Sequence, residues 1–473
     1  MSGIRTRNKR LQVGFGGIVS NTDESVLSHE YAVQCLNFVI ENGVLKGSIG
    51  IDKAKGYFKE PNRNRHEYPE FPADKSIKRI FHYRRTNNGE YDDRIVVHLQ
   101  DGYMWYTSVF SNDVWHKVES LRLYGDVNAI NYNYNGEDVL LLASATDGLF
   151  IIKDTTAYYC SSAPKFCSIA VHSERVFGAV NGVQNQVWFS KDFDPANWSV
   201  SSSDAGFINF ADGLGDVIKV VSFLNYLYIF REYGILRLTA FGEQSDFILK
   251  KVFTDTGRIY KDTIVECGDK IVFYAEGGIF VFDGYNVSRI ANQIPEILNK
   301  TAMCAAYLDD CYYLACRIVE DDFLNNAVIR YDFSKKSFSI LYGVQIRWLC
   351  SAKMHNGASV FCAFDNTATN VVGELSNSGC VLSVPTHKKY VSPKNDLSTE
   401  KVKAFRSMSV LCKYPVSISV NIDGKVYVYD IAGKDELQTV IIEKFGKKFG
   451  IEIECDSADA LVAPISVNLD VIA

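Results

Sequence analysis

Short apolar runs and polar turn residues alternate along most of the chain, and the alternation repeats. Each repeat has a polar or acidic residue, an apolar run, a short turn that often contains glycine, and a second apolar run. Clear copies read "DDRIVVHLQDGYMWY", "EDVLLLASATDGLFII", "NYLYIFREYGILRL" and "DKIVFYAEGGIFVFDG". Counting three weaker or longer copies, the repeats start near positions 92, 137, 174, 225, 269, 310 and 358. Such runs, rich in Val, Ile, Tyr and Phe, are typical of β-strands joined by hairpins.

The spacing of the copies predicts the architecture. A period of roughly 40–45 residues with several short strands per repeat is typical of a β-propeller blade. We therefore expect an all-β protein with a β-propeller over residues 59–383, of about seven blades, with six or eight as alternatives. A series of unrelated hairpins in sandwiches is the competing interpretation. Helices should be few: a single turn at 295–299 and, with strand and turn as an equal alternative, a short helix within 28–40.

Three other segments lie outside the repeats. Residues 1–58 are expected to form an N-terminal arm and a lead-in strand, and residues 384–400 a linker. Residues 401–473 alternate strictly, as in "SVLCKYPVSISVNIDGKVYVYDIAG", which predicts a separate C-terminal antiparallel β-sandwich. Aspartate and glycine favour tight turns, so structural turn roles are predicted for Asp101, Gly102, Asp147, Gly148, Gly277, Gly278, Asp283, Gly284, Asp423 and Gly424.

The acidic loop in "VWFSKDFDPANWSV" is the strongest single candidate for chemistry. Asp192 and Asp194 lie close to Trp198, so the loop resembles a catalytic or calcium site. Calcium needs more oxygen ligands than this loop supplies, and Asp-Pro sequences are common in plain turns. We therefore predict that Asp192, Asp194 and Pro195 shape a blade turn and that Trp198 packs back on its sheet.

Elsewhere the sequence offers little support for an enzyme. The eight histidines show no metal-ligand spacing, and the chain has no nucleophile elbow, P-loop or dinucleotide fingerprint. Gly14–Gly17 lacks the lysine of a phosphate loop, and adjacent acids such as Asp309 and Asp310 point to opposite faces of a strand. We predict no catalytic residues, no metal site and no cofactor.

Composition restricts the class of protein and the state of its cysteines. Of 473 residues 47% are hydrophobic and 22% charged, which indicates a globular core, and the net charge of −6 argues against a general nucleic-acid binder. The twelve cysteines are scattered without zinc spacing, so reduced, buried thiols are expected. The basic, polar start "MSGIRTRNKR" and the lack of a long apolar run predict folding in a cytoplasm and no membrane-spanning segment.

Several motifs together resemble one family. "AVQCLNFVIENGVLKGSIG" is similar to an entry segment with an asparagine, a short strand, G-x-L and a closing glycine, here Asn37, Gly43, Leu45 and Gly50. "VWFSKDFDPANWS", "GDVIKVVSFLNYLYIFREYGILRL" and "GGIFVFDGYNVSRIANQIPEIL" resemble blade motifs of the same proteins, and "KFGKKFGIEIEC" resembles their closing sandwich strands. The family is the propeller-containing nozzle, or tail accessory, proteins of short-tailed bacteriophages. One departure is that "LKGSIG" lacks the arginine usually found before the closing glycine.

The resemblance implies a structural protein of the virion tail, assembled in the host cytoplasm. Such nozzles form rings, usually hexamers, below the portal and adaptor, where they extend the DNA channel, retain the genome and permit its ejection. Double-stranded DNA would pass without sequence-specific binding. The basic residues Arg5, Arg7, Lys9 and Arg10 form a possible docking arm for a neighbouring ring, with a solvated tail as the alternative. A propeller glycosidase and a carbohydrate-binding adhesin of cell-surface glycans remain the alternative functions.

Overall fold

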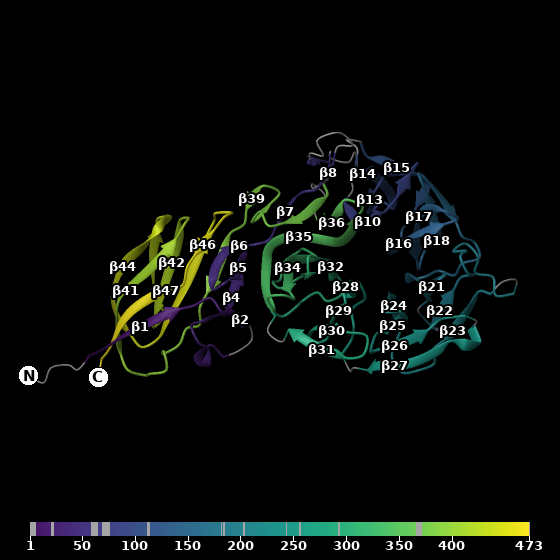
Figure 1. Cartoon of the computed structure of the whole chain (residues 1–473). Helices are drawn as coiled ribbons and strands as arrows, with labels where there is room; N and C mark the ends of the chain where they lie inside the picture. The colour runs from purple at the N-terminus through teal and green to yellow at the C-terminus, as the bar shows by residue number, and fades with distance from the viewer. Residues whose placement is uncertain are drawn as a thin grey trace, which may run out of the picture.

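The computed structural model describes residues 6–19, 23–57, 65–68, 76–110, 114–180, 182, 185–201, 204–242, 244–254, 257–291, 294–365 and 371–472. These residues form strands, turns and three single-turn 3₁₀ segments, η1 (Glu24–Val26), η2 (Gln244–Asp246) and η3 (Lys261–Thr263). The strands build a β-propeller and a β-sandwich that lie next to each other in an elongated molecule (Figure 1). None of the helical segments in the described ranges is long and apolar enough to cross a membrane.

The propeller has seven four-stranded antiparallel blades, whose first strands meet around the axis. Blade 1 contains β10 (Ile77–Tyr83), β13 (Arg94–Leu99), β14 (Tyr103–Ser108) and β15 (His116–Arg122), and blade 2 contains β16 (Val127–Tyr134), β17 (Glu137–Ser144), β18 (Gly148–Lys153) and β19 (Thr156–Tyr159). Blade 3 contains β20 (Ser168–His172), β21 (Arg175–Val180), β22 (Gln186–Phe189) and β23 (Gly206–Asn209). Blade 4 contains β24 (Val217–Phe223), β25 (Tyr226–Arg231), β26 (Gly234–Thr239) and β27 (Ile248–Thr254).

The last three blades complete the circle. Blade 5 contains β28 (Val265–Cys267), β29 (Lys270–Ala275), β30 (Gly278–Phe282) and β31 (Val287–Ala291), and blade 6 contains β32 (Cys304–Leu308), β33 (Cys311–Cys316), β34 (Asn325–Asp332) and the first part of β35 (Ser337–Met354). The remainder of β35 is the first strand of blade 7, followed by β36 (Gly357–Phe364), β37 (Gly373–Ser376) and β7 (Gly50–Lys53). The outer strand of blade 7 therefore comes from the N-terminal part of the chain.

Each sequence repeat forms the second and third strands of one blade. The repeat at position 92 becomes β13 and β14, and the repeat at position 358 becomes β36 and β37. Second strands lie in the middle of their sheets and are covered by neighbouring blades on both faces, so β13 is buried along its whole length. This double burial is why the repeats appear as continuous apolar runs. The predicted propeller and the count of seven blades are confirmed.

The sandwich packs two sheets around a single apolar core. One sheet contains β44 (Lys434–Gly446), β41 (Lys403–Cys412), β47 (Ile465–Ile472), β1 (Thr6–Val13), β46 (Leu461–Val462), β6 (Val44–Gly47) and β5 (Phe38–Glu41). The other contains β4 (Gln34–Leu36), β40 (Lys388–Val391), β45 (Phe449–Cys455), β42 (Val416–Ile422) and β43 (Lys425–Ile431). Minor pairs are β2 (Gly17–Ile18) with β3 (Tyr31–Ala32), β8 (Lys55–Tyr57) with β9 (Arg65–Glu67), β11 (Thr86–Asn87) with β12 (Glu90–Tyr91), and β38 (Cys380–Val381) with β39 (Val384–Pro385).

The predicted boundaries need correction. Residues 1–58 are not an arm ahead of the propeller, because β1, β4, β5 and β6 are sandwich strands and β7 closes blade 7. The predicted linker 384–400 is not a free connection either, since β40 lies between β4 and β45 in a sandwich sheet. The sandwich is thus built from both ends of the chain, and the propeller is inserted between them.

The described residues 28–40 follow the strand-and-turn alternative rather than the helix, and the helical turn expected at 295–299 is absent. Residues 28–40 contain the short strands β3, β4 and β5, and residues 295–299 form no helical turn. Strand pairing with β40 and β6 supplies the backbone partners that a helix in 28–40 would have provided internally.

Asn37 connects the two parts of the molecule. Its side-chain amide donates to the carbonyl oxygens of Tyr342 (3.1 Å) and His387 (2.7 Å), and its Oδ1 accepts from the Tyr342 backbone N–H at 2.7 Å. Tyr342 belongs to β35, whereas His387 precedes the sandwich strand β40. Lys335 and Glu41 add an ion pair of 2.7 Å across the same junction. The asparagine of the entry segment is therefore a buried bracket between propeller and sandwich.

Candidate functional site

The acidic loop 190–199 is held by contacts inside blade 3 and to its neighbour. Asp192 forms an ion pair with Arg175 (2.7 Å), and the Asp194 carboxylate accepts from the Ala196 N–H and the Tyr134 hydroxyl. Trp198 is fully buried, and its ring nitrogen donates to the carbonyl of Pro195 at 2.8 Å. Both aspartates that suggested a site are thus engaged in contacts with the loop itself and with adjacent strands.

The other predicted turn residues lie at strand connections. Positive φ angles, which favour glycine, occur at Gly102, Gly148, Gly277, Gly278, Gly284 and Gly424. Asp101, Asp147 and Asp283 accept hydrogen bonds from nearby backbone N–H groups. Asp423 has a φ of 48° beside Gly424, and its carboxylate also accepts from the Lys447 and Lys448 N–H groups. These residues lie at strand connections of blades 1, 2 and 5 and of the sandwich.

A charged cluster joins the first strands of the blades at one end of the axis. Arg79 of β10 lies 3.4 Å from Asp126 and 3.2 Å from Asp262, and its guanidinium covers the ring of Trp348 at 4.1 Å. Lys219 donates to the carbonyl oxygen of Ile264, and burial lowers the pKa of this lysine to about 8. The arginine is thus neutralised within the cluster, which ties blade 1 to neighbours across the axis.

A second polar cluster closes the circle between blades 1 and 7. The carboxylate of Asp93 is completely buried, at 3.3 Å from Nε2 of His82 and 3.0 Å from Nδ1 of His355. The His355 backbone N–H also donates to Asp93 at 2.7 Å, and the ring of Tyr91 stacks on His355. Burial acts to raise the pKa of Asp93, but the hydrogen bonds from His82 and His355 outweigh it and lower that pKa.

Potential metal ligands are scattered over the part of the chain that the structure describes. Among the described residues no group of three or more His, Cys, Asp or Glu side chains is arranged to hold a metal ion. The twelve cysteines are free, ten of them are buried, and burial raises the pKa of Cys35 and Cys304 to about 12. The adjacent acids Asp309 and Asp310 form the turn between β32 and β33, both with positive φ.

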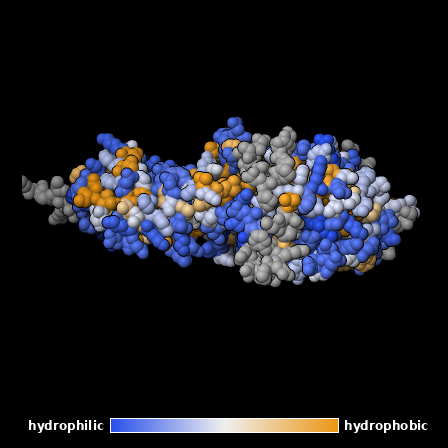
Figure 2. All heavy atoms as spheres, turned by 90° about the horizontal axis from the view of Figure 1, so that it is seen from above, coloured by the Kyte–Doolittle hydropathy of each residue, from blue (hydrophilic) through white to orange (hydrophobic). Residues whose placement is uncertain are grey.

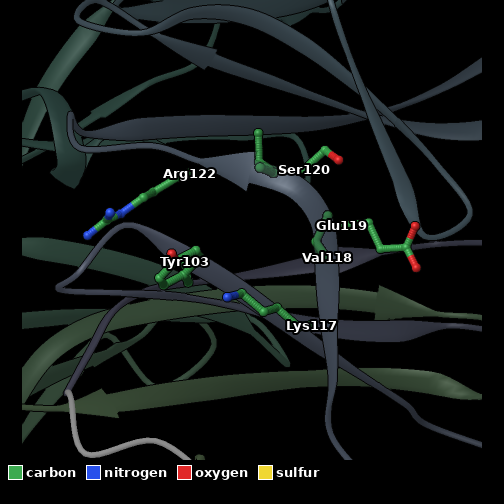
Figure 3. Close-up of a pocket in the computed structure, with 7 residues that line it drawn as sticks. Tyr103, Lys117, Val118, Glu119, Ser120 and Arg122 are labelled. Atoms are coloured by element: carbon green, nitrogen blue, oxygen red, sulfur yellow. The ribbon is translucent and has the colours of Figure 1, made fainter.

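A hollow of about 600 Å³ lies on the outer strands of blade 1 (Figure 3). In Figure 3 the Tyr103 ring lies between Lys117 and Arg122, while Glu119 points away. The Lys117 ammonium is 3.2 Å from the ring centre and the Arg122 guanidinium 4.8 Å. Two cations therefore lie against the Tyr103 ring, which is engaged in cation–π contacts.

The sandwich carries an exposed apolar flank on β43 and β44, which are edge strands of its two different sheets. Figure 2 shows apolar side chains gathered over the sandwich at the end away from the propeller. Five side chains on these two strands are between 57% and 71% exposed: Val426, Val428, Leu437, Ile441 and Phe445. Among the described residues, β43 pairs only with β42 and β44 only with β41, so both strands have a free edge. Exposed apolar residues on a free edge are typical of a surface that a partner covers.

The opposite edge of the sheet that contains β44 is basic. Arg7, Lys9 and Arg10 of the predicted docking arm lie in β1, paired with β47, and are exposed, whereas Arg5 lies outside the described residues. The Arg10 guanidinium donates to Ser466, and no ion pair in the described ranges involves Arg7, Lys9 or Arg10. The predicted arm is therefore an edge strand with unneutralised positive charge.

Sequence reasoning missed both the flank and the Asp93 cluster. The strict alternation at 416–431 predicted strands, but it did not indicate which of them lies at a sheet edge. His82 and His355 are far apart in sequence and meet at Asp93 only because the propeller closes on itself. A charged residue inside the apolar repeat "DDRIVVHL" was the one available signal for the buried carboxylate.

No protein-family model matches the chain, and no curated protein matches it. Solved structures similar to this chain are propellers at low identity. The BBS1N structure in complex with ARL6DN is 9% identical over 65% of this chain and 93% of its own, with a TM-score of 0.44. BamB from Moraxella catarrhalis is 9% identical over 72% and 94%, with a TM-score of 0.39. The Neurospora crassa Pan2 WD40 domain is 9% identical over 65% and 97%, with a TM-score of 0.37.

Proposed function

We propose that this protein is a structural subunit of the tail of a short-tailed bacteriophage. Identical copies would form a ring, usually of six, below the portal and adaptor. The ring would extend the DNA channel, retain the packaged genome and permit its ejection. The role is structural rather than catalytic, with other tail proteins as partners.

The observation that carries the proposal is the free, apolar flank of β43 and β44. A sandwich with a complete core has no internal need for five strongly exposed aliphatic or aromatic side chains on two edge strands. A lasting partner accounts for them, because permanent interfaces are more apolar than ordinary surface. The motif resemblance to tail nozzle proteins supports the same interpretation.

The construction of the chain suits such a role. A closed propeller leaves only short edges, and the buried clusters at Arg79 and Asp93 fix its blades to each other. The bracket at Asn37 and the insertion of the propeller into the sandwich hold the two parts in one orientation. A rigid subunit of this kind transmits load between neighbours without needing a reaction.

The mass of the assembled particle tests the proposal. The full chain should form a discrete ring whose mass is a whole-number multiple of the chain mass, measured by native mass spectrometry. It should also co-purify with tail particles when expressed with portal and adaptor proteins. A chain that stays monomeric both alone and together with these virion proteins would overturn the proposal.

A further inference from the structure

The sheet that contains β44 also contains β1, at its opposite edge. The strands lie in the order β44, β41, β47 and β1, and the two outer strands each have one strand partner among the described residues. Their outward N–H and C=O groups are therefore available for another strand. A molecule with two free edges on one sheet is able to join copies of itself in a row.

Strand direction permits such a joint. Each of the three pairings from β44 to β1 is antiparallel, so β44 and β1 run in opposite directions. A second copy in the same orientation would bring its β1 beside β44 of the first as an antiparallel neighbour. The sheet would then continue from one copy to the next with the more stable of the two ladder types.

The faces of the two strands limit the register. In β1, Leu11 and Val13 face the core, so odd-numbered residues point inward and even-numbered residues outward. In β44, Val440 and Ile442 face the core and Lys434 pairs with the buried Cys412, so even-numbered residues point inward on both sides of the register irregularity between Gln438 and Lys434. A continuous sheet requires inward residues opposite inward residues, because a shift by one position reverses every side chain.

One of the allowed registers also matches charge. It places Lys9 opposite Glu436 on the inner face and Arg10 opposite Asp435 on the outer face. The same register sets Asn8 opposite Leu437 and aligns residues 6–11 with residues 434–439. Opposite charges directly across antiparallel strands stabilise the pair, whereas like charges destabilise it.

Charge also disfavours the symmetric contact, in which the same strand of two copies would pair with itself. Strand β1 carries three cations and no acid, so two β1 strands from different copies would repel each other. Strand β44 carries three acids and two lysines, with Asp435 and Glu436 adjacent in its sequence. A basic edge thus meets an acidic, partly apolar edge only in a head-to-tail contact.

We propose that neighbouring copies of this chain join head to tail, with β1 of one copy adding to β44 of the next in the register that sets Lys9 opposite Glu436. The proposal rests on the proposed ring function and names the contact that builds the ring. A contact between two different surfaces produces a ring when its rotation closes. Of the five exposed apolar side chains of the flank, only Leu437 lies in the segment 434–439 that β1 would pair with.

A paired-cysteine variant tests the register. In the full chain, Asn8→Cys together with Leu437→Cys places two thiols directly opposite each other, within disulfide distance for adjacent strands. Mild oxidation should produce a ladder of covalent multimers on a non-reducing gel. A reducing agent should convert these multimers back to the monomer band. The matched control combines Asn8→Cys with Ile441→Cys, which lies on the same face four residues out of register and should give no ladder. Equal ladders from both pairs, or none from either, would overturn the register and the contact.

Charge exchange tests the contact by a second route. Lys9→Glu with Arg10→Glu makes both edges acidic, and Asp435→Lys with Glu436→Lys makes both edges basic. Each variant alone should associate at least about tenfold more weakly than the unaltered chain, since two ion pairs become repulsive. Mixed in equal amounts, the two variants should associate as strongly as the unaltered chain, in alternating order. Sedimentation velocity over a concentration series measures all three samples.

The outcomes separate this inference from the proposed function. If the unaltered chain forms rings but neither charge variant weakens them, the β1 to β44 contact is wrong while the ring remains. If the charge variants weaken association but the mixture does not restore it, the head-to-tail pairing is also wrong. If the chain is monomeric alone yet enters tail particles, the strand contact is overturned and the tail function stands.

Discussion

Replacing Asp93 by asparagine should loosen the joint between the first and last blades. The carboxylate is fully buried and receives a backbone N–H from His355 and ring nitrogens from His82 and His355. Asparagine keeps the shape but loses the negative charge, and the amide nitrogen that replaces one carboxylate oxygen cannot accept from a ring N–H. Charge-assisted hydrogen bonds contribute roughly 1.5–3 kcal/mol each, and a buried donor left without a partner costs about 1–3 kcal/mol. We expect the propeller to lose about 3 kcal/mol of unfolding free energy.

The loss should depend on pH in a defined direction. Hydrogen bonds outweigh burial and hold the pKa of Asp93 below its ordinary value of 3.8. A carboxyl group with a depressed pKa in the folded state contributes fully above its unfolded pKa, and its contribution falls as pH drops through the folded pKa. The difference between the unaltered chain and Asp93→Asn should therefore be constant above about pH 5 and shrink below pH 4.

Tryptophan fluorescence isolates this effect. All five tryptophans, at positions 105, 115, 188, 198 and 348, belong to the propeller segment, so urea unfolding followed by their emission reports the propeller alone. Asp322→Asn is a matched control, because it makes the same chemical change at an exposed position of blade 6 and should shift the unfolding free energy by less than about 0.5 kcal/mol. A loss at Asp93→Asn no larger than that of the control would refute the reasoning.

Three further predictions use the same chain. Trp198→Ala should cost roughly 3–5 kcal/mol in urea unfolding, whereas Phe193→Ala, in the same loop but exposed, should change little. Ile51→Ala in the closing strand β7 should cost roughly 2–5 kcal/mol, with the exposed Val384→Ala as its control, and equal losses would contradict the role of β7 in the core. A thiol reagent should modify no more than two of the twelve cysteines quickly in the folded chain and all twelve after unfolding, and rapid reaction of more than two would contradict their burial.

The blades were predictable because each leaves a local signal. A second strand buried on both faces appears as a continuous apolar run, and in several blades a Gly or Asp-Gly turn follows it, as at Gly102 and Gly148. These signals need only neighbouring residues. The period between them then gave the blade number.

The boundaries were not predictable from the same signals. Residues 6–13 include Arg7, Lys9 and Arg10, and this polar character resembles a solvated arm. What makes the segment a strand is the free edge of β47, more than 450 residues later in the chain. Local composition carries no record of such a distant partner. For the same reason, the contacts of His82 and His355 with Asp93 could not be predicted from the sequence.

The insertion of the propeller into the sandwich has a mechanical consequence. Two chain crossings, one before β7 and one after β39, connect the parts side by side, so the propeller is unable to swivel about a single tether. A torque applied at β1 or β44 therefore reaches the propeller as a shear along β7, the outer strand of blade 7. The hydrogen bonds between β7 and β37, which complete blade 7, therefore also bear load when the sandwich is pulled.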